Sequence, residues 1–264
     1  MNFKILPFLL FPLIAGALTG AFSNSGVLKP QIGGMRCLPS SFLREIESGE
    51  TGGRVPPSLF NFNLCYPTLP GRGPEVEELN LRLKLIPLFD FNSHWRGVDF
   101  KELIPVGRER GWQFFYSAEG RITKNDRQLL SVYYQFESYA GGAHPISYYR
   151  VFNWNRKEWR PLNLRQFLKP GGLEALLEGL LEWDKSHSNK IEWPEGVRAQ
   201  KKLPKFVVTE RGLLFLFDQG EVAPMVAGPI QLLYPFPLLK PLLNKEGLQF
   251  FHLSPLSHRN LWER

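Results

Sequence analysis

The chain has 264 residues, a hydrophobic content of 43%, a charged content of 22% and a formal net charge of +7. This length allows one large domain or two small ones with a substantial core, and the composition is ordinary for a globular protein. An aromatic content of 14% and 22 prolines favour sheets, turns and rigid loops over a long helical bundle. The basic residues are scattered, with no run longer than two, so nucleic acid is not an expected partner.

Residues 1–21 have the layout of a secretory signal. Lys4 precedes an apolar run over 5–15, and small residues follow, so cleavage is expected after Ala17 or Ala21. An uncleaved membrane anchor is the alternative, but two prolines in a short apolar run disfavour a stable span. The sequence therefore predicts an extracytoplasmic protein, periplasmic or secreted, that meets a membrane only if residues 1–21 are retained.

Cysteine usage agrees with export, because Cys37 and Cys65 are the two cysteines of the chain. In an oxidising compartment they are expected to form one disulfide that clamps an irregular N-terminal segment over 22–58. A pair of unlinked thiols is the alternative. A metal site is not expected, since the cysteines have no histidines nearby.

Residues 59–160 are expected to form a first unit of strands with one amphipathic helix. Val76, Leu79, Leu83 and Ile86 recur at helical spacing, which predicts a helix over 75–86. Residues 87–111 are expected to be loops with short extended pieces. Further expected elements are a short helix at 39–46 and strands at 59–64, 112–116 and 121–124.

The stretch over 129–155 organises this unit. Apolar and polar residues alternate on both sides of the sequence Gly-Gly-Ala-His-Pro at 141–145, which predicts two half-buried strands joined by a shaped loop. Gly141 and Gly142 allow positive φ angles, and Pro145 fixes the exit from the loop.

Residues 161–243 are expected to form a second unit, followed by an aromatic tail over 244–264 that packs back or binds a partner. Asn163 is expected to cap a short helix, and leucines at i, i+3, i+4, i+7 and i+8 from Leu173 predict a longer helix with one buried stripe. The remaining expected elements are a polar loop or frayed helix at 184–202, a hairpin of 206–209 with 213–217, a strand at 231–234 and a helical turn at 238–243.

Several short strings in this order resemble a known extracytoplasmic family. They are YP at 66–67, LSV at 130–132, YAGGAHP at 139–145, FVV at 206–208, GL at 212–213, EVAP at 221–224, AGP at 227–229 and LL at 238–239. Over about residues 60–243 the chain resembles the uncharacterised domain pair in the ectodomain of the lysozyme-sensing anti-sigma factor RsiV. A related domain precedes the catalytic domain of a peptidoglycan deacetylase.

This resemblance implies an α+β fold of two sub-domains, each a mainly antiparallel sheet with flanking helices. One member of the family binds lysozyme and another accompanies a cell-wall enzyme. The chain shows neither a deacetylase domain nor a segment before the apolar run at residue 5 that would bind a sigma factor, so we expect the exported module alone.

Catalysis is the less favoured interpretation. His144 has Glu137 and Asp126 nearby in sequence, and Glu221 follows Asp218, so a cell-wall polysaccharide hydrolase or deacetylase that uses His144 and Glu221 is the alternative function. The histidine spacing matches no metal-binding motif, and no nucleophile elbow or phosphate loop is present. We expect a non-enzymatic protein without a cofactor or metal.

The preferred hypothesis is a binding module of the cell envelope. Tyr139, Gly141, Gly142, His144 and Tyr148 are the expected ligand-binding residues, because aromatic side chains on a rigid loop supply contact area at a low entropy cost. Without residues 1–21 the chain keeps a net charge of +6, which favours a cell-wall glycan or anionic polymer over a basic lysozyme-like protein. A local acidic patch would reverse this preference. The sequence makes no prediction about the oligomeric state.

Overall fold

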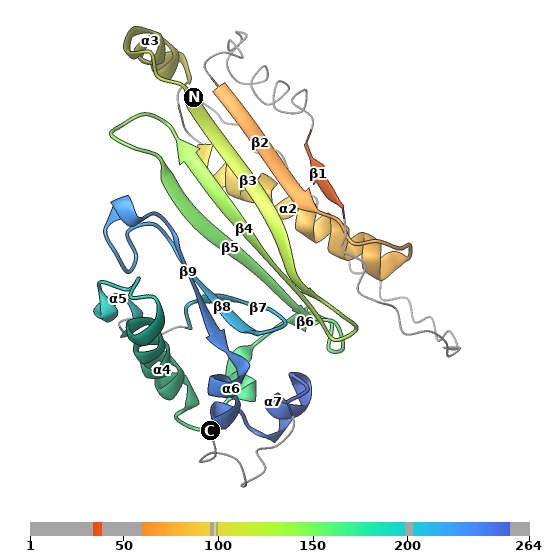
Figure 1. Ribbon diagram of the computed structural model, residues 1–264. Helices are drawn as coiled ribbons and strands as arrows, with labels where there is room; N and C mark the ends of the chain where they lie inside the picture. The colour runs from red at the N-terminus through yellow and green to blue at the C-terminus, as the bar shows by residue number, and fades with distance from the viewer. Residues whose placement is uncertain (1–33, 39–59, 96–97, 99, 199–202, 254–264) are drawn as a thin grey trace, which may run out of the picture.

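A six-stranded sheet and a three-stranded sheet form the frame of the computed structural model, which describes residues 34–38, 60–95, 98, 100–198 and 203–253 (Figure 1). Both sheets are mostly antiparallel and helices flank them, so the predicted α+β class is confirmed. The predicted signal, the helix at 39–46 and the end of the tail lie outside the described residues. The division into sub-domains at residue 160 stays a prediction.

The large sheet has its strands in chain order. β2 and β3 are parallel, and α2 and α3 make the crossover that parallel neighbours require. All other neighbours in this sheet are antiparallel. The strands are β1 (Met35–Cys37), β2 (Phe60–Pro67), β3 (Phe114–Asn125), β4 (Leu129–Tyr139), β5 (Ile146–Asn155) and β6 (Arg160–Pro161).

The two central strands, β4 and β5, are confirmed, but the predicted half-burial is wrong for β4. Val132 and Tyr134 pack in the core beneath α2, while Tyr133 and Tyr149 on the opposite face pack against Val207 of the second sheet. Because both faces of the large sheet are covered, alternate residues of β4 are buried on both sides.

The helical region after β2 is longer than the sequence predicts. α2 (Pro74–Trp95) continues through Pro87, and α3 (Phe100–Arg110) follows it, so the prediction of loops over 87–111 is wrong. Proline removes one helical hydrogen bond, but Pro87 is buried on the same face as Leu83 and Phe91. Burial of this continuous apolar face against the sheet compensates for the lost bond.

β3 is one strand where two short ones were expected. It runs the whole length of β4, and a shift in register between Ile122 and Lys124 accommodates the change of twist. The strand therefore spans from α3 to the turn that leads into β4.

The second sheet contains β7 (Lys205–Val208), β8 (Gly212–Phe217) and β9 (Ile230–Pro235), which confirms the hairpin and the last strand. α4 (Gly172–His187) places Leu176, Leu177 and Leu180 in the core of this sheet, as the leucine stripe predicts. Asn163 caps the short helix η1 (Leu164–Phe167), also as expected. α5 (Pro194–Arg198) occupies part of the expected polar loop, and α6 (Phe236–Leu239) and η3 (Lys240–Leu242) form the expected helical turn.

The tail packs back on the fold as far as residue 253, where the description ends. α7 (Lys245–Phe250) brings Phe250 to a ring-centre distance of 4.5 Å from Phe167, and Phe251 lies 5.8 Å from the same ring. Phe251 is buried in the core of the second sheet, so this part of the tail belongs to that core.

Polar side chains of the large sheet fix the position of the second sheet. Ser131 Oγ accepts a hydrogen bond of 2.8 Å from Val208 N, and Thr123 Oγ1 donates one of 2.7 Å to Val208 O. Asn153 Nδ2 donates to Phe206 O at 2.7 Å. These bonds satisfy backbone N–H and C=O groups on the outer edge of β7, so the two sheets have one defined mutual arrangement.

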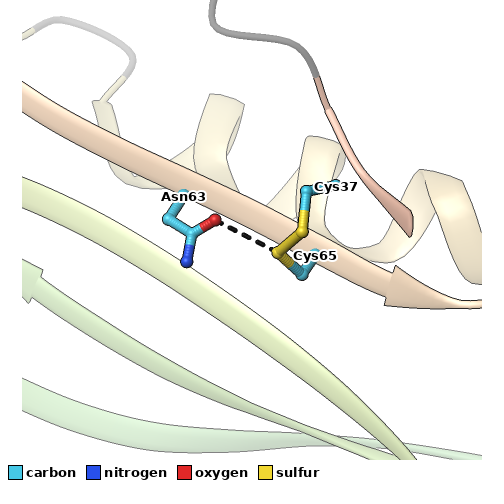
Figure 2. The surroundings of a disulfide bond; sticks show 3 residues. All are labelled: Cys37, Asn63 and Cys65. Carbon is cyan, nitrogen blue, oxygen red and sulfur yellow. Dashed lines mark hydrogen bonds between the residues drawn. A yellow bond between two sulfur atoms is a disulfide. The ribbon is translucent and has the colours of Figure 1, made fainter. Parts of the chain in front are cut away.

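Cys37 and Cys65 form a disulfide that joins β1 to β2, with Asn63 Oδ1 3.1 Å from Cys65 Sγ (Figure 2). The predicted pairing is confirmed, and it is compatible with an extracytoplasmic location. Within the described residues, no helix has the length and apolar character needed to cross a membrane.

Candidate functional site

The loop between β4 and β5 has the rigid shape that its sequence predicts. Gly141 and Gly142 have φ angles of 98° and 109°, a region that favours glycine. A Cβ atom on Gly141 would lie 2.9 Å from the Trp112 ring, so this glycine also allows close packing. Tyr139 Oη donates a hydrogen bond of 2.8 Å to Gly142 O, and the His144 side chain is exposed at the tip.

A second loop, between β8 and β9, is joined to this one. Gln219 N donates to Ser147 O at 3.1 Å, and Ser147 N donates to Gln219 Oε1 at 2.8 Å. Gln219 Nε2 also donates to Met225 O at 2.9 Å, which holds the second loop in shape. Figure 1 shows both loops at the same end of the molecule. We call residues 139–147 and 218–228 together the loop platform.

Three aliphatic side chains of the loop platform are exposed. The exposed fractions are 50% for Ile146, 40% for Met225 and 96% for Val226. Trp193 is also exposed. It lies next to the platform, since its backbone N donates to Val222 O at 2.9 Å. Exposed apolar side chains that gather in one place are typical of a surface that contacts another molecule.

The charge around the loop platform is opposite to that of the whole chain. The stretches 128–149, 191–197 and 212–239, which include the platform, contain no lysine or arginine. They contain five acidic residues: Glu137, Glu192, Glu195, Asp218 and Glu221. Basic side chains beside these stretches include Lys205, which pairs with Asp218, Lys190, whose Nζ donates to Gln231 O at 3.3 Å, and Arg110, which lies over the Trp112 ring. In a chain of net charge +7 this is a local acidic surface.

Tyr148 is separated from the other expected binding residues. Tyr139, Gly141, Gly142 and His144 lie in the loop platform, whereas Tyr148 is buried between the large sheet and α2. Side chains alternate between the faces of a strand, so Tyr148 points to the face opposite Tyr149 and the second sheet. The binding role of the four platform residues stays a prediction.

Tyr148 belongs to a cluster around the buried carboxylate of Asp90. Asp90 Oδ1 accepts hydrogen bonds from Tyr116 Oη, at 2.6 Å, and from Tyr148 Oη. Arg150 Nε donates to Asp90 Oδ2 at 2.7 Å. His94 Nδ1 lies 3.1 Å from Tyr148 Oη and 3.8 Å from Asp90 Oδ1. We call these five residues the Asp90 cluster, and it joins α2, β3 and β5.

The sequence reasoning missed the Asp90 cluster because it placed Asp90 and His94 in an expected loop. One signal was present: Asp90 and His94 are four residues apart and continue the helical spacing of Leu83 and Phe91 beyond Pro87. The contacts with β3 and β5 depend on the tertiary fold and have no signature in the sequence.

Burial and hydrogen bonding change the acidity of the core tyrosines. Burial, followed by the hydrogen bond to Asp90, raises the pKa of Tyr116 and of Tyr148 well above the ordinary value. Burial also raises the pKa of Tyr134, whose Oη donates to Leu83 O at 2.7 Å. All three hydroxyls are therefore held in the neutral form that donates a hydrogen bond.

This arrangement predicts an alkaline limit to stability. A tyrosine with a raised pKa in the folded state stabilises the fold fully below its unfolded pKa of about 10, and this contribution declines as the pH rises further. We expect the free energy of unfolding to fall above about pH 10, with Tyr116, Tyr134 and Tyr148 ionising only as the protein unfolds. Tyrosinate absorbance and circular dichroism, followed together against pH, test this. Complete ionisation of all eight tyrosines with the dichroism unchanged would contradict it.

Two acidic residues of the alternative catalytic hypothesis, Glu221 and Asp218, have structural roles. Glu221 Oε2 accepts a hydrogen bond of 2.7 Å from Asp218 N and closes the turn after β8. Asp218 Oδ1 accepts one of 2.8 Å from Tyr149 N, which ties the turn to β5. Among the residues that the structure describes, no group of three or more histidine, cysteine or acidic side chains has an arrangement that would hold a metal ion.

One segment of the chain is similar to a family of known sequences. Residues 166–236, from η1 to the start of α6, match a family described as "Protein of unknown function (DUF3298)". Two solved structures of that family have a similar fold. One, from Bacteroides fragilis, has a TM-score of 0.51 and 17% sequence identity, and the alignment covers 74% of this chain and 88% of that protein. The other, from Pseudomonas aeruginosa, has a TM-score of 0.50 and 14% sequence identity, and the alignment covers 86% of this chain and 95% of that protein.

Two curated relatives come from Mycobacterium tuberculosis. The immunogenic protein MPT64 is 28% identical over 101 residues, which is 36% of this chain and 44% of that protein. A protein named esterase Rv3036c is 27% identical over 141 residues, which is 51% of this chain and 62% of that protein. The matched regions thus span less than two thirds of each relative.

Proposed function

We propose that this chain is a non-catalytic binding module of the cell envelope that binds a basic, lysozyme-like protein on the loop platform. The observation that carries the proposal is the combination of exposed Ile146, Met225 and Val226 with an acidic border that lacks lysine and arginine. Such a surface attracts a positively charged partner and offers it apolar contact area.

The same observation favours a protein over an anionic cell-wall polymer at this surface. An anionic polymer would meet Glu137 and Glu192 in stretches that contain no lysine or arginine. Aliphatic side chains such as Val226 and Met225 offer a polymer few hydrogen bonds, but they pack well against the apolar part of a protein surface. The local charge thus outweighs the preference that the net charge of the chain indicates.

Three further features support the location and the partner. The disulfide between Cys37 and Cys65 suits an oxidising compartment, and residues 1–21 have the layout of an export signal. The resemblance to the RsiV ectodomain points to lysozyme as the kind of basic protein that is bound. The structural roles of Glu221 and Asp218 agree with a protein that binds and does not hydrolyse.

Titration calorimetry of the purified protein against a basic lysozyme, an acidic protein of similar size and soluble peptidoglycan fragments tests the proposal. We expect lysozyme to bind with a micromolar or lower Kd that weakens as salt is raised, because opposite charges are screened. The acidic protein is expected to give no binding. Absence of lysozyme binding at low salt, or equal binding of the acidic protein, would overturn the proposal.

A further inference from the structure

We propose that the α2 side of β5 contains a second site, which binds an acidic saccharide through Arg150, His94 and Phe152. This inference is independent of the proposed function, because Arg150 and Phe152 lie on the sheet face that packs on α2 and not in the loop platform. Along 146–153 no described strand pairs with β5 on its outer side, since β6 pairs with Trp154 and Asn155. The outer backbone groups of Ser147 and Tyr149 bond to Gln219 and Asp218, so the site consists of side chains on the α2 face of the strand.

Arg150 is a fixed cation with a free edge. Its Nε donates to buried Asp90, and its Cζ lies 4.9 Å from the centre of the Tyr148 ring. Of the terminal nitrogens, Nη1 makes one long contact of 3.5 Å with Tyr149 O, and the side chain is 44% exposed. A guanidinium that is held in this way presents its outer nitrogens to a carboxylate without losing further conformational freedom.

The negative charge of Asp90 does not face the ligand. The carboxylate is buried, and Tyr116 and Tyr148 donate to Oδ1 while Arg150 occupies Oδ2. An incoming anion therefore meets the guanidinium and not the carboxylate. The buried aspartate acts as a positioning group for the cation.

His94 supplies a second polar group beside Arg150. Its ring stacks on Tyr148 with a centre distance of 5.0 Å and an interplanar angle of 9°, and its Nδ1 lies 3.1 Å from Tyr148 Oη. Because Tyr148 Oη donates to Asp90, Nδ1 donates to Tyr148 Oη, and Nε2 on the other side of the ring is an acceptor for a sugar hydroxyl. His94 and Arg150 thus share one supporting ring and are both exposed.

Phe152 provides the surface for a sugar ring. It is two residues after Arg150 on the same face of β5, a separation of roughly 7 Å along the strand. This separation suits one pyranose ring whose carboxylate reaches Arg150. Buried Trp154 stacks on Phe152 at a ring-centre distance of 5.7 Å and an interplanar angle of 4°, which fixes the orientation of the Phe152 ring.

Nuclear magnetic resonance of the wild-type protein tests this site with a hexamer of galacturonic acid as the probe. Maltohexaose, a neutral glycan of the same length, and inorganic phosphate are the comparison ligands. We expect the hexauronate to shift the Arg150 Nε–H signal and the amide signals of β5 at submillimolar to millimolar concentration. Equal shifts with maltohexaose, equal shifts with phosphate, or no shift at 146–155 would each overturn the proposal.

Variants separate the site from the overall charge of the protein. Arg150→Gln is expected to weaken hexauronate binding at least tenfold. The matched control Arg121→Gln removes the same charge from an exposed side chain of β3 on the opposite face, and is expected to change binding less than twofold. His94→Gln keeps the pair between Arg150 and Asp90 and is expected to weaken binding about threefold with an unchanged melting temperature. Equal losses in Arg150→Gln and Arg121→Gln, or unchanged binding in His94→Gln, would contradict the assignment.

Discussion

Replacement of Asp90 by alanine is expected to lower the free energy of unfolding by about 4 kcal/mol, which corresponds to a fall in Tm of roughly 10 °C. The substitution leaves two buried tyrosine hydroxyls, of Tyr116 and Tyr148, without an acceptor that they use in the wild type. Each buried unsatisfied hydroxyl costs about 1–3 kcal/mol. Arg150 adds less, because its side chain is 44% exposed and regains water.

Glu119→Ala is the matched control for Asp90→Ala. Glu119 is an exposed acid that pairs with Arg121 at 3.1 Å, so its removal is expected to change stability by less than about 1 kcal/mol. Tyr116→Phe and Tyr148→Phe remove one donor each and are expected to give intermediate losses of about 1–1.5 kcal/mol. Urea unfolding of the four variants measures these differences. A loss in Asp90→Ala as small as that in Glu119→Ala would show that the cluster does not hold α2 to the sheet.

Val226→Lys is expected to weaken binding of a basic lysozyme about 100-fold, while the fold keeps its stability. Val226 is 96% exposed, so its replacement disturbs no packing within the chain. The lysine removes an apolar contact and brings a positive charge against a positive partner, two effects that act in the same direction. Calorimetry of the variant measures the change in Kd, and circular dichroism confirms the fold.

Leu81→Lys provides the same chemical change away from the loop platform. Leu81 is 54% exposed on α2, on the other face of the large sheet. The Leu81→Lys substitution adds the same charge as Val226→Lys, and it is expected to change the Kd for lysozyme less than threefold. If Leu81→Lys weakens binding as much as Val226→Lys, the net charge of the protein determines the affinity and the platform does not.

The sequence predicts the local elements of this fold well. Alternation on both sides of Gly141 and Gly142 locates β4, β5 and their loop, because strand period and positive-φ glycines are local properties. The leucine stripe locates α4 for the same reason. The pairing of Cys37 with Cys65 follows from the chain having two cysteines.

The predictions that fail depend on contacts between distant residues. Pro87 indicates the end of a helix, but burial against the sheet keeps α2 intact as far as Trp95. Strand alternation indicates a sheet with one solvent-exposed face, but β7 and β8 cover that face of β4. Tyr148 is grouped with the loop by its position in the sequence, and tertiary contact with Asp90 places it in another site.

The loop platform also results from long-range contact. Ser147 and Gln219 are 72 residues apart, and nothing in either neighbourhood indicates that they pair. The absence of lysine and arginine from three separate stretches is visible in the sequence, but it becomes a surface property only when the fold brings the stretches together.

Hydrogen–deuterium exchange of the protein alone and saturated with a basic lysozyme tests the central claim most directly. A partner on the loop platform slows exchange in 139–147 and 218–228 and leaves α2, Pro74–Trp95, unchanged. Slower exchange confined to α2 and the outer edge of β5, or no slower exchange in either loop at saturation, would contradict the assignment of the loop platform as the binding surface.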